Sequence, residues 1–168
     1  MLTDLGFRLR AFWHSQGAAP RPGVREAELV DAEVRLGVAL PHDVRSLYAI
    51  VNGTGEADGD DLFSVWPLSE CRDLVAVAAE WSRGIPDHGK IAASPGAAEY
   101  VVFADCMISS EFLSVRVRPS GSLSDVMWSC GEHYAPVATS FEDFWERYLE
   151  DRDLILHPND ALIRKATG

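Results

Sequence analysis

The stretch from Glu26 to Gly53, EAELVDAEVRLGVALPHDVRSLYAIVNG, decides the fold of this chain. Its apolar residues recur at spacings of three and four, which is typical of amphipathic helices. The spacing occurs twice, over Leu29, Ala32 and Leu36 (with Glu33 at the remaining position), and again over Val44, Leu47, Tyr48 and Val51. Gly37 stops the first helix, because glycine adopts the left-handed conformation of a C-terminal cap. Pro41 opens the second near its first position, and Gly53 closes it, so the stretch predicts a helical hairpin.

Shorter elements are expected on both sides of the hairpin. Residues 3–16 are expected to form a helix, and the prolines and glycines of 17–23 to break it. After the hairpin, 54–61 (TGEADGDD) predicts a charged loop and 62–66 a short strand. Pro67 then begins a helix that extends to about Ser82, with an apolar face wide enough for burial on more than one side.

The second half of the chain changes from helical to two-residue periodicity after the Gly/Pro-rich span 84–97. Strands are expected at 100–104, 113–117, about 125–129 and 134–138, with a turn at 119–122 that makes the pairing antiparallel. Thr139 or Ser140 then caps a last helix, whose core face is Phe141, Phe144, Trp145 and Tyr148. The prediction is a single α+β domain with N-terminal helices, a central antiparallel sheet meander and a closing C-terminal helix.

The composition indicates a folded domain with an acidic surface. The chain has 168 residues, 47% of them hydrophobic, and a net charge of −11. Such a surface repels nucleic acids and anionic membranes, whereas a basic protein partner would be attracted to it. No apolar run approaches the ~20 residues of a membrane span, and three cysteines without paired spacing indicate free thiols. A cytoplasmic protein is expected.

Several motifs of the chain resemble those of a known family, the SUKH superfamily, which is named partly for a fungal regulator of cell-wall assembly. The motifs are Leu36-Gly37-Val38, Leu40-Pro41, Tyr48, Asn52-Gly53, Trp66-Pro67-Leu68, the strand Val102–Ser110 and the strand-to-helix junction Val137–Phe144. The resemblance covers residues 24–151, leaving an N-terminal helix and linker at 1–23 and a tail at 152–168 that could add a short packed helix. It implies an α+β fold without catalysis. Bacterial members commonly act as immunity proteins, which bind and block a cognate toxin of a polymorphic toxin system.

The candidate partner-binding residues are Glu56, Asp58, Asp60 and Asp61 in the acidic loop, together with Trp128 and His133. A calcium-binding EF-hand loop needs glycine at its sixth position and glutamate at its twelfth. Counted from Glu56, those positions hold Asp61 and Pro67, so we expect a solvated loop that attracts a basic partner. Trp128 is expected to be exposed at a strand end, because aromatic anchors are enriched at interface centres.

Metal binding and catalysis have weaker signals. Cys130 and His133 have the spacing of two zinc ligands, but Cys71 and Cys106 do not supply the second pair that a structural site needs. A hydrolase using Cys106 with His133 and Asp125 is a remote alternative. No metal, cofactor or catalytic residue is predicted.

Two further patterns have structural explanations. Glu142 and Glu146 share a helix face, but a solvent-facing surface explains them. The helical hairpin could be mistaken for a DNA-binding motif, although Arg45 is the only strong candidate contact in its second helix.

The leading hypothesis is a non-enzymatic binding protein that neutralises a basic toxin. The alternative from the same resemblance is a regulatory or scaffold protein that coordinates growth of the cell envelope.

Overall fold

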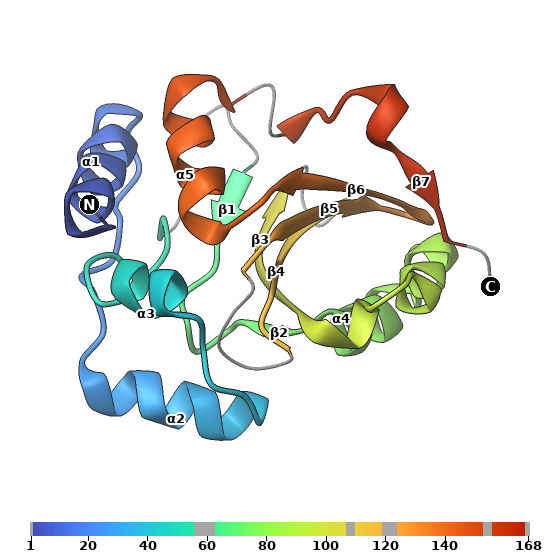
Figure 1. The fold of residues 1–168 in the computed structure, drawn as a ribbon, viewed down its shortest axis with the longest axis horizontal. Coiled ribbons are helices and arrows are strands. Elements are labelled where there is room, and N and C mark those ends of the chain that lie inside the picture. The colour runs from blue at the N-terminus through green and yellow to red at the C-terminus, as the bar shows by residue number, and fades with distance from the viewer. Residues whose placement is uncertain (1, 56–62, 107–109, 119–123, 153–155, 167–168) are drawn as a thin grey trace.

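Seven antiparallel strands form one sheet with helices on both faces in the computed structural model (Figure 1), which describes residues 2–55, 63–106, 110–118, 124–152 and 156–166. The elements are α1 (Leu2–Ser15), α2 (Glu26–Leu36), α3 (His42–Tyr48), β1 (Phe63–Val65), β2 (Arg72–Asp73), α4 (Leu74–Trp81), the 3-10 helices η1 (Pro86–Ala93) and η2 (Ala97–Glu99), β3 (Tyr100–Cys106), β4 (Glu111–Arg116), β5 (Val126–Cys130), β6 (His133–Ala138), α5 (Phe141–Glu150), the 3-10 helix η3 (Asp160–Leu162) and β7 (Arg164–Lys165). The predicted single α+β domain, with an antiparallel meander and a closing helix, is confirmed.

The predicted helical hairpin is present as α2 and α3. Gly37 follows α2 with φ 65°, and the amide of Val38 donates to the carbonyl of Glu33 at 3.1 Å. This left-handed glycine with its backward hydrogen bond ends the helix as the sequence predicted.

The second helix of the hairpin is shorter than predicted. Pro41 is its N-cap rather than its first residue, and α3 ends at Tyr48 rather than near Val51. Val51 instead forms a β-bridge with Pro22, so the backbone leaves the helix to pair with the segment before α2.

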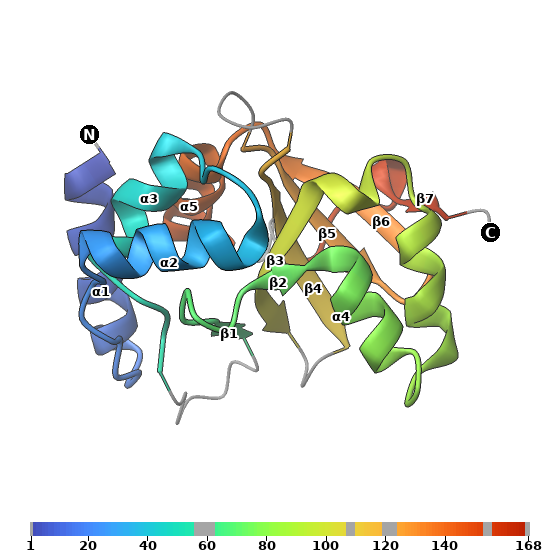
Figure 2. The same cartoon turned by 90° about the horizontal axis from the view of Figure 1, so that it is seen from below.

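The sheet is built around β3, which has partners on both sides. β1 and β2 pair with different parts of the same edge of β3, and β4 pairs with the other edge. From β4 the sheet continues through β5, β6 and β7 in spatial order. Figure 2 shows α2 and α3 to the left of this sheet and α4 to the right, in front of its strands.

The helix predicted from Pro67 to about Ser82 starts seven residues late. The amide of Glu70 donates to the Pro67 carbonyl at 2.8 Å, which closes a turn. The next residues, Arg72 and Asp73, pair with β3 as β2, and α4 begins only at Leu74. Strand pairing has overridden the helical periodicity here, because the backbone groups of this segment complete the edge of the sheet.

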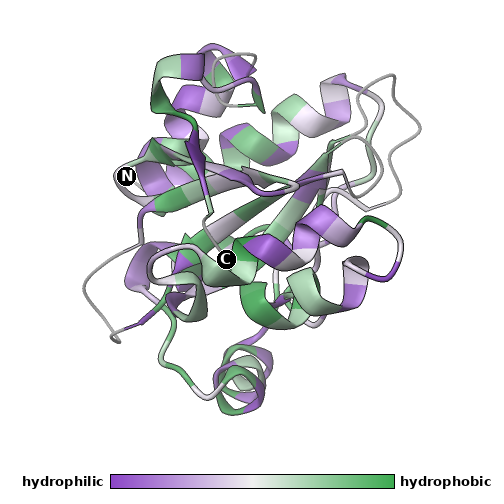
Figure 3. Cartoon of the chain, turned by 90° about the vertical axis from the view of Figure 1, so that its right-hand side faces the viewer, coloured by the Kyte–Doolittle hydropathy of each residue, from purple (hydrophilic) through white to green (hydrophobic). Residues whose placement is uncertain are grey.

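Two aromatic layers form the core, one on each face of the sheet. On the α5 face, the ring of Phe103 contacts Trp145 with centroids 5.8 Å apart. On the α4 face, the ring of Phe112 lies 4.2 Å from Trp81 and 5.2 Å from His88. Figure 3 shows the central strands largely in the green of apolar residues, whereas the helices alternate. The apolar run of β3 is explained by burial on both of its faces.

His88 is an unusual member of the α4-face layer. Its side chain is 2% exposed, and neither ring nitrogen has a hydrogen-bond partner within the described residues. Burial lowers the pKa of this imidazole, while the nearby Asp87 raises it by a smaller amount. The neutral ring is therefore the form that fits the core.

We expect His88 to make the fold less stable in mild acid. Because its folded pKa lies below the ordinary value near 6.5, the unfolded chain binds the proton more readily, and stability falls as the pH decreases below about 6.5. His88→Phe should flatten the dependence of unfolding free energy on pH between 7 and 5. Urea titrations of both proteins at several pH values measure this, and parallel curves would contradict it.

The last helix and the tail complete the fold. The Ser140 hydroxyl accepts from the Asp143 amide at 3.0 Å, which confirms the predicted cap of α5. Beyond α5 the tail forms η3, close to the predicted short helix, and then β7, which the sequence did not predict. Lys165 and Lys90 both bind Glu132 and hold the pKa of that carboxyl at about 2, so the end of the tail is tied to the sheet.

Candidate functional site

The predicted acidic loop lies outside the described residues. Glu56, Asp58, Asp60 and Asp61 belong to the undescribed segment 56–62, so their role in partner binding stays a prediction from charge.

Trp128 is buried, and the expectation that it is exposed is wrong. Its side chain is 7% exposed, and its indole N–H donates to Oε2 of Glu111 at 2.9 Å. The residue lies on β5, opposite Leu113 of β4, and β5 is flanked by a strand on each side. A tryptophan on an inner strand packs into the core, whereas the sequence pattern had suggested a strand end.

His133 is exposed and lies at the start of β6, opposite Cys130. Cys106 is in the same row across the sheet, but β4 and β5 separate its strand from β6. Neighbouring strands are about 4.8 Å apart, so Cys106 and His133 are too far apart to share a proton. Asp125 accepts a hydrogen bond from the Tyr100 hydroxyl at 2.6 Å. The structure therefore does not assemble these three residues into a catalytic group.

The cysteines have the properties of structural thiols. Burial raises the pKa of Cys130, and the nearby carboxylate of Glu111 raises it further. Burial likewise raises the pKa of Cys71 to about 12. Thiols with raised pKa values are weak nucleophiles at neutral pH. Among the described residues, no group of three or more histidines, cysteines or acidic residues could hold a metal ion.

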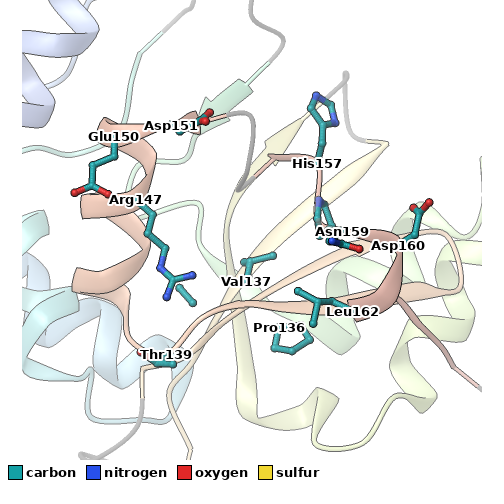
Figure 4. Close-up of a pocket in the computed structure, with 12 residues that line it drawn as sticks. Pro136, Val137, Thr139, Arg147, Glu150, Asp151, His157, Asn159, Asp160 and Leu162 are labelled. Carbon is teal, nitrogen blue, oxygen red and sulfur yellow. The ribbon is translucent and has the colours of Figure 1, made fainter.

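A groove with a volume of about 1040 Å³ lies between β6, α5 and the segment 157–162 (Figure 4). Its floor is the end of β6, from Pro136 to Thr139, and Leu162 extends over it from the opposite wall. Leu162 is 49% exposed. The groove therefore combines an apolar floor with an apolar side chain that reaches solvent.

Charged residues on the walls of the groove are mostly acidic. Glu150 and Asp151 come from the end of α5, and Asp160 from η3. Among the described residues of the lining, Arg147 is the one arginine, and it donates through Nε to Asp143 on the previous turn at 2.8 Å. Figure 4 shows the Arg147 side chain directed toward the groove and the carboxylates of Glu150 and Asp160 directed away from it.

A second exposed apolar surface lies on α2. Val30 and Val34 are 45% and 77% exposed, and their spacing of four places them on one face of the helix, opposite the buried Leu29 and Leu36. This face is flat helix surface, whereas the groove is concave, and concave sites are the more usual binding sites.

Sequence reasoning did not identify the groove, although its lining falls within residues 136–162, because it forms only where the segment 157–162 folds back beside β6. One signal was available: Pro136 interrupts an apolar strand, and proline within a strand indicates an edge. The packing of the tail against this edge depends on β7, which is only two residues long.

The chain was compared with known proteins. A model of the SMI1 / KNR4 family (SUKH-1) matches residues 23–147, about three quarters of the chain. No curated protein matches it. Within the described residues, no helix is both long and apolar enough to cross a membrane. The groove extends beyond the matched region, since segment 157–162 lies after it. From the extent and position of the match, this chain belongs to the SMI1 / KNR4 family (SUKH-1).

Proposed function

We propose that the chain is an immunity-type protein that neutralises a cognate toxin by binding it, without catalysing a reaction. The observation that carries the proposal is the family match over residues 23–147, since bacterial SUKH proteins resembling this one commonly act in this way. The net charge of −11 supports a basic partner. The separation of Cys106 from His133 supports binding rather than catalysis.

Electrostatic attraction would increase the rate at which such a protein associates with its toxin. A toxin must be captured before it acts, and complementary charges raise association rates well above those of neutral partners. Ion pairs such as Arg8–Glu146 and Lys165–Glu132 join the first helix and the tail to the rest of the fold.

Co-expression with the candidate toxin encoded by the neighbouring gene tests the proposal. We expect the chain to restore growth of the cells and to co-purify with the toxin. Toxicity that continues despite a well-expressed, folded chain would overturn the proposal for that toxin. Failure of both readouts with every neighbouring candidate would favour the regulatory role instead.

The acidic loop is expected to accelerate association. Replacing Asp58, Asp60 and Asp61 by asparagine should slow association with the neutralised toxin by about tenfold at low salt and flatten its salt dependence. Stopped-flow measurements at several ionic strengths provide both quantities.

The matched control changes the same number of charges elsewhere. Asp4→Asn, Asp31→Asn and Glu70→Gln remove three exposed carboxylates from other parts of the surface. If both triple variants slow association equally, the effect comes from net charge. If neither does, the loop is excluded as the docking surface.

A further inference from the structure

We propose that the groove between β6, α5 and segment 157–162 binds a segment of a protein partner in which an aspartate or glutamate lies beside apolar residues. The carboxylate of that segment binds the guanidinium of Arg147, and its apolar side chains cover the floor of the groove. The proposal rests on the proposed function only in taking the partner to be a protein. It assigns this contact to a surface different from the acidic loop.

Arg147 is directed into the groove from α5, whereas the carboxylates of Glu150 and Asp160 are directed away from it (Figure 4). The Nε of Arg147 donates to Oδ1 of Asp143 at 2.8 Å. Among the residues that the structure describes, the terminal nitrogens of this guanidinium have no hydrogen-bond partner. They form a planar pair of donors, which fits the two oxygens of a carboxylate.

Asp143 orients Arg147 and leaves those terminal donors unused. Its Oδ2 accepts from the amide and the hydroxyl of Thr139 at 2.9 and 3.1 Å. Burial raises the pKa of Asp143, but the hydrogen bonds from Thr139 and Arg147 outweigh it and lower the pKa below its ordinary value. The carboxylate is therefore ionised at neutral pH and holds the guanidinium in place. A donor group that is already oriented loses less conformational freedom when a ligand binds.

The floor beside Arg147 is apolar, and the groove is open to solvent. Val137 and Ala138 of β6 are buried, and Leu162 of the opposite wall is 49% exposed. Most of the other lining residues are exposed. A small molecule is usually buried over most of its surface in its pocket, whereas a polypeptide segment can leave one side in solvent. The volume of about 1040 Å³ also suits several residues of a chain.

The strand edge in the floor makes side chains the main basis of recognition. β7 pairs with β6 only at His133 and Tyr134, so within the described parts of the chain the outer edge of β6 beyond Tyr134 has no strand partner. Pro136 has no amide hydrogen to donate to an added strand. A bound segment is therefore held by Arg147 and by apolar packing rather than by a full ladder of backbone hydrogen bonds.

The net charge of −11 is compatible with this contact. Exposed charges more than about 8–10 Å apart are largely screened at physiological ionic strength, so a carboxylate in the groove responds mainly to nearby groups. Its hydrogen bonds to Arg147 are charge-assisted, which makes them stronger than neutral ones. A partner that is basic as a whole can therefore still contribute an acidic segment at this one place.

A display library of random twelve-residue peptides, panned on the full chain, tests the proposal. We expect the selected peptides to carry aspartate or glutamate beside apolar residues. Arg147→Gln should weaken binding of the best synthetic peptide by about tenfold, measured by fluorescence anisotropy. Arg147→Lys should lose most of the same affinity, because lysine keeps the charge but not the planar pair of donors.

Changing the peptide and the protein together locates the contact. Replacing the acidic residue of the peptide by its amide should weaken binding to the unchanged chain by about tenfold, but to Arg147→Gln by less than about twofold, because both changes remove the same contact. Leu162→Ser should weaken binding by about fivefold without altering the effect of the amide. Equal effects of the amide on the unchanged chain and on Arg147→Gln would overturn the proposal.

Two control variants accompany the measurement. Arg83→Gln removes an exposed arginine that follows α4, and Val34→Ser removes the exposed valine of α2. Neither residue lines the groove, so both variants should leave the peptide affinity within about twofold. If Arg83→Gln weakens binding as much as Arg147→Gln, the effect comes from net charge and the proposal fails. Circular dichroism confirms that each variant is folded, since all of the replaced side chains are exposed.

The outcomes separate this proposal from the proposed function. A library that yields no binding peptide, or only peptides without acidic residues, would overturn the groove as a site for an acidic segment. So would a dimer that Leu162→Ser dissociates, because it would show a second copy there. Toxin rescue by the unchanged chain without any peptide that depends on Arg147 would overturn the groove and leave the immunity function intact. Peptide binding that depends on Arg147, without rescue from any neighbouring toxin, would do the reverse.

Discussion

Replacing Trp145 by alanine is expected to destabilise the fold by about 3–5 kcal/mol, the usual cost of removing a large aromatic side chain from a core. Trp145 is fully buried. Its ring makes edge contacts with Phe144 at 4.8 Å, Trp13 at 5.6 Å and Phe103 at 5.8 Å. These contacts join α5, α1 and β3, so the cavity would open where three elements meet. Urea denaturation followed by circular dichroism measures the loss.

Trp145→Phe is the control for this prediction. The indole N–H of Trp145 has no hydrogen-bond partner within the described residues, so phenylalanine keeps a ring and removes an unpaired donor. We expect it to cost less than about 2 kcal/mol. Similar costs for alanine and phenylalanine would show that the packing around Trp145 relaxes easily, contrary to the structure.

Gly53→Ala is expected to be strongly destabilising, although it removes no side chain from the stretch that decides the fold. Gly53 has φ 84°, and a Cβ added there would lie 2.6 Å from the Val65 carbonyl oxygen. The same turn is fixed by Asn52, whose Oδ1 accepts from the Leu68 amide at 2.7 Å. Left-handed strain alone costs about 1–2 kcal/mol, and the backbone clash adds to it. We expect a loss above about 2 kcal/mol in chemical denaturation.

Gly37→Ala separates the two contributions. Gly37 has φ 65°, but a Cβ there would meet no atom within 4 Å. Its substitution should therefore show the conformational cost without the clash, about 1 kcal/mol. If the two glycine variants lose the same stability, the close approach of Gly53 to β1 does not contribute.

The hairpin and the closing helix could be predicted because their signals are local. Gly37 ends α2, and Ser140 caps α5, through groups within four residues of each other. The alternation over 113–117 also predicted a strand where β4 lies, although Ser114 is buried together with its apolar neighbours.

The predictions from the sequence were wrong where paired strands, rather than the local sequence pattern, set the surroundings of a residue. Residues 72–73 have helical periodicity but pair with Val102 and Val101 of β3. Trp128 has the composition of an interface anchor, but β4 and β6 enclose its strand. In both cases the environment of the residue is set by the strands that pair with its own strand, which the local pattern of apolar residues does not record.

The candidate site was likewise only partly predictable from the sequence. The acidity of the chain was evident from its composition and predicted a basic partner. The groove was not predicted, because it forms only when the tail around Leu162 folds back beside β6, and no local pattern indicates that packing.

By itself, the sequence determined the helical hairpin, the α+β class and the net charge of −11, since turn chemistry, periodicity and composition act over a few residues or over the whole chain at once. The tertiary structure decided that Trp128 is buried, where the sheet ends and where the groove beside β6 forms. Trp128 is enclosed because β5 pairs with β4 and β6. Among the described residues the sheet ends at β7, which pairs with β6 at two positions, His133 and Tyr134. Such a short contact stabilises little by itself and exists because the rest of the fold holds its two strands together.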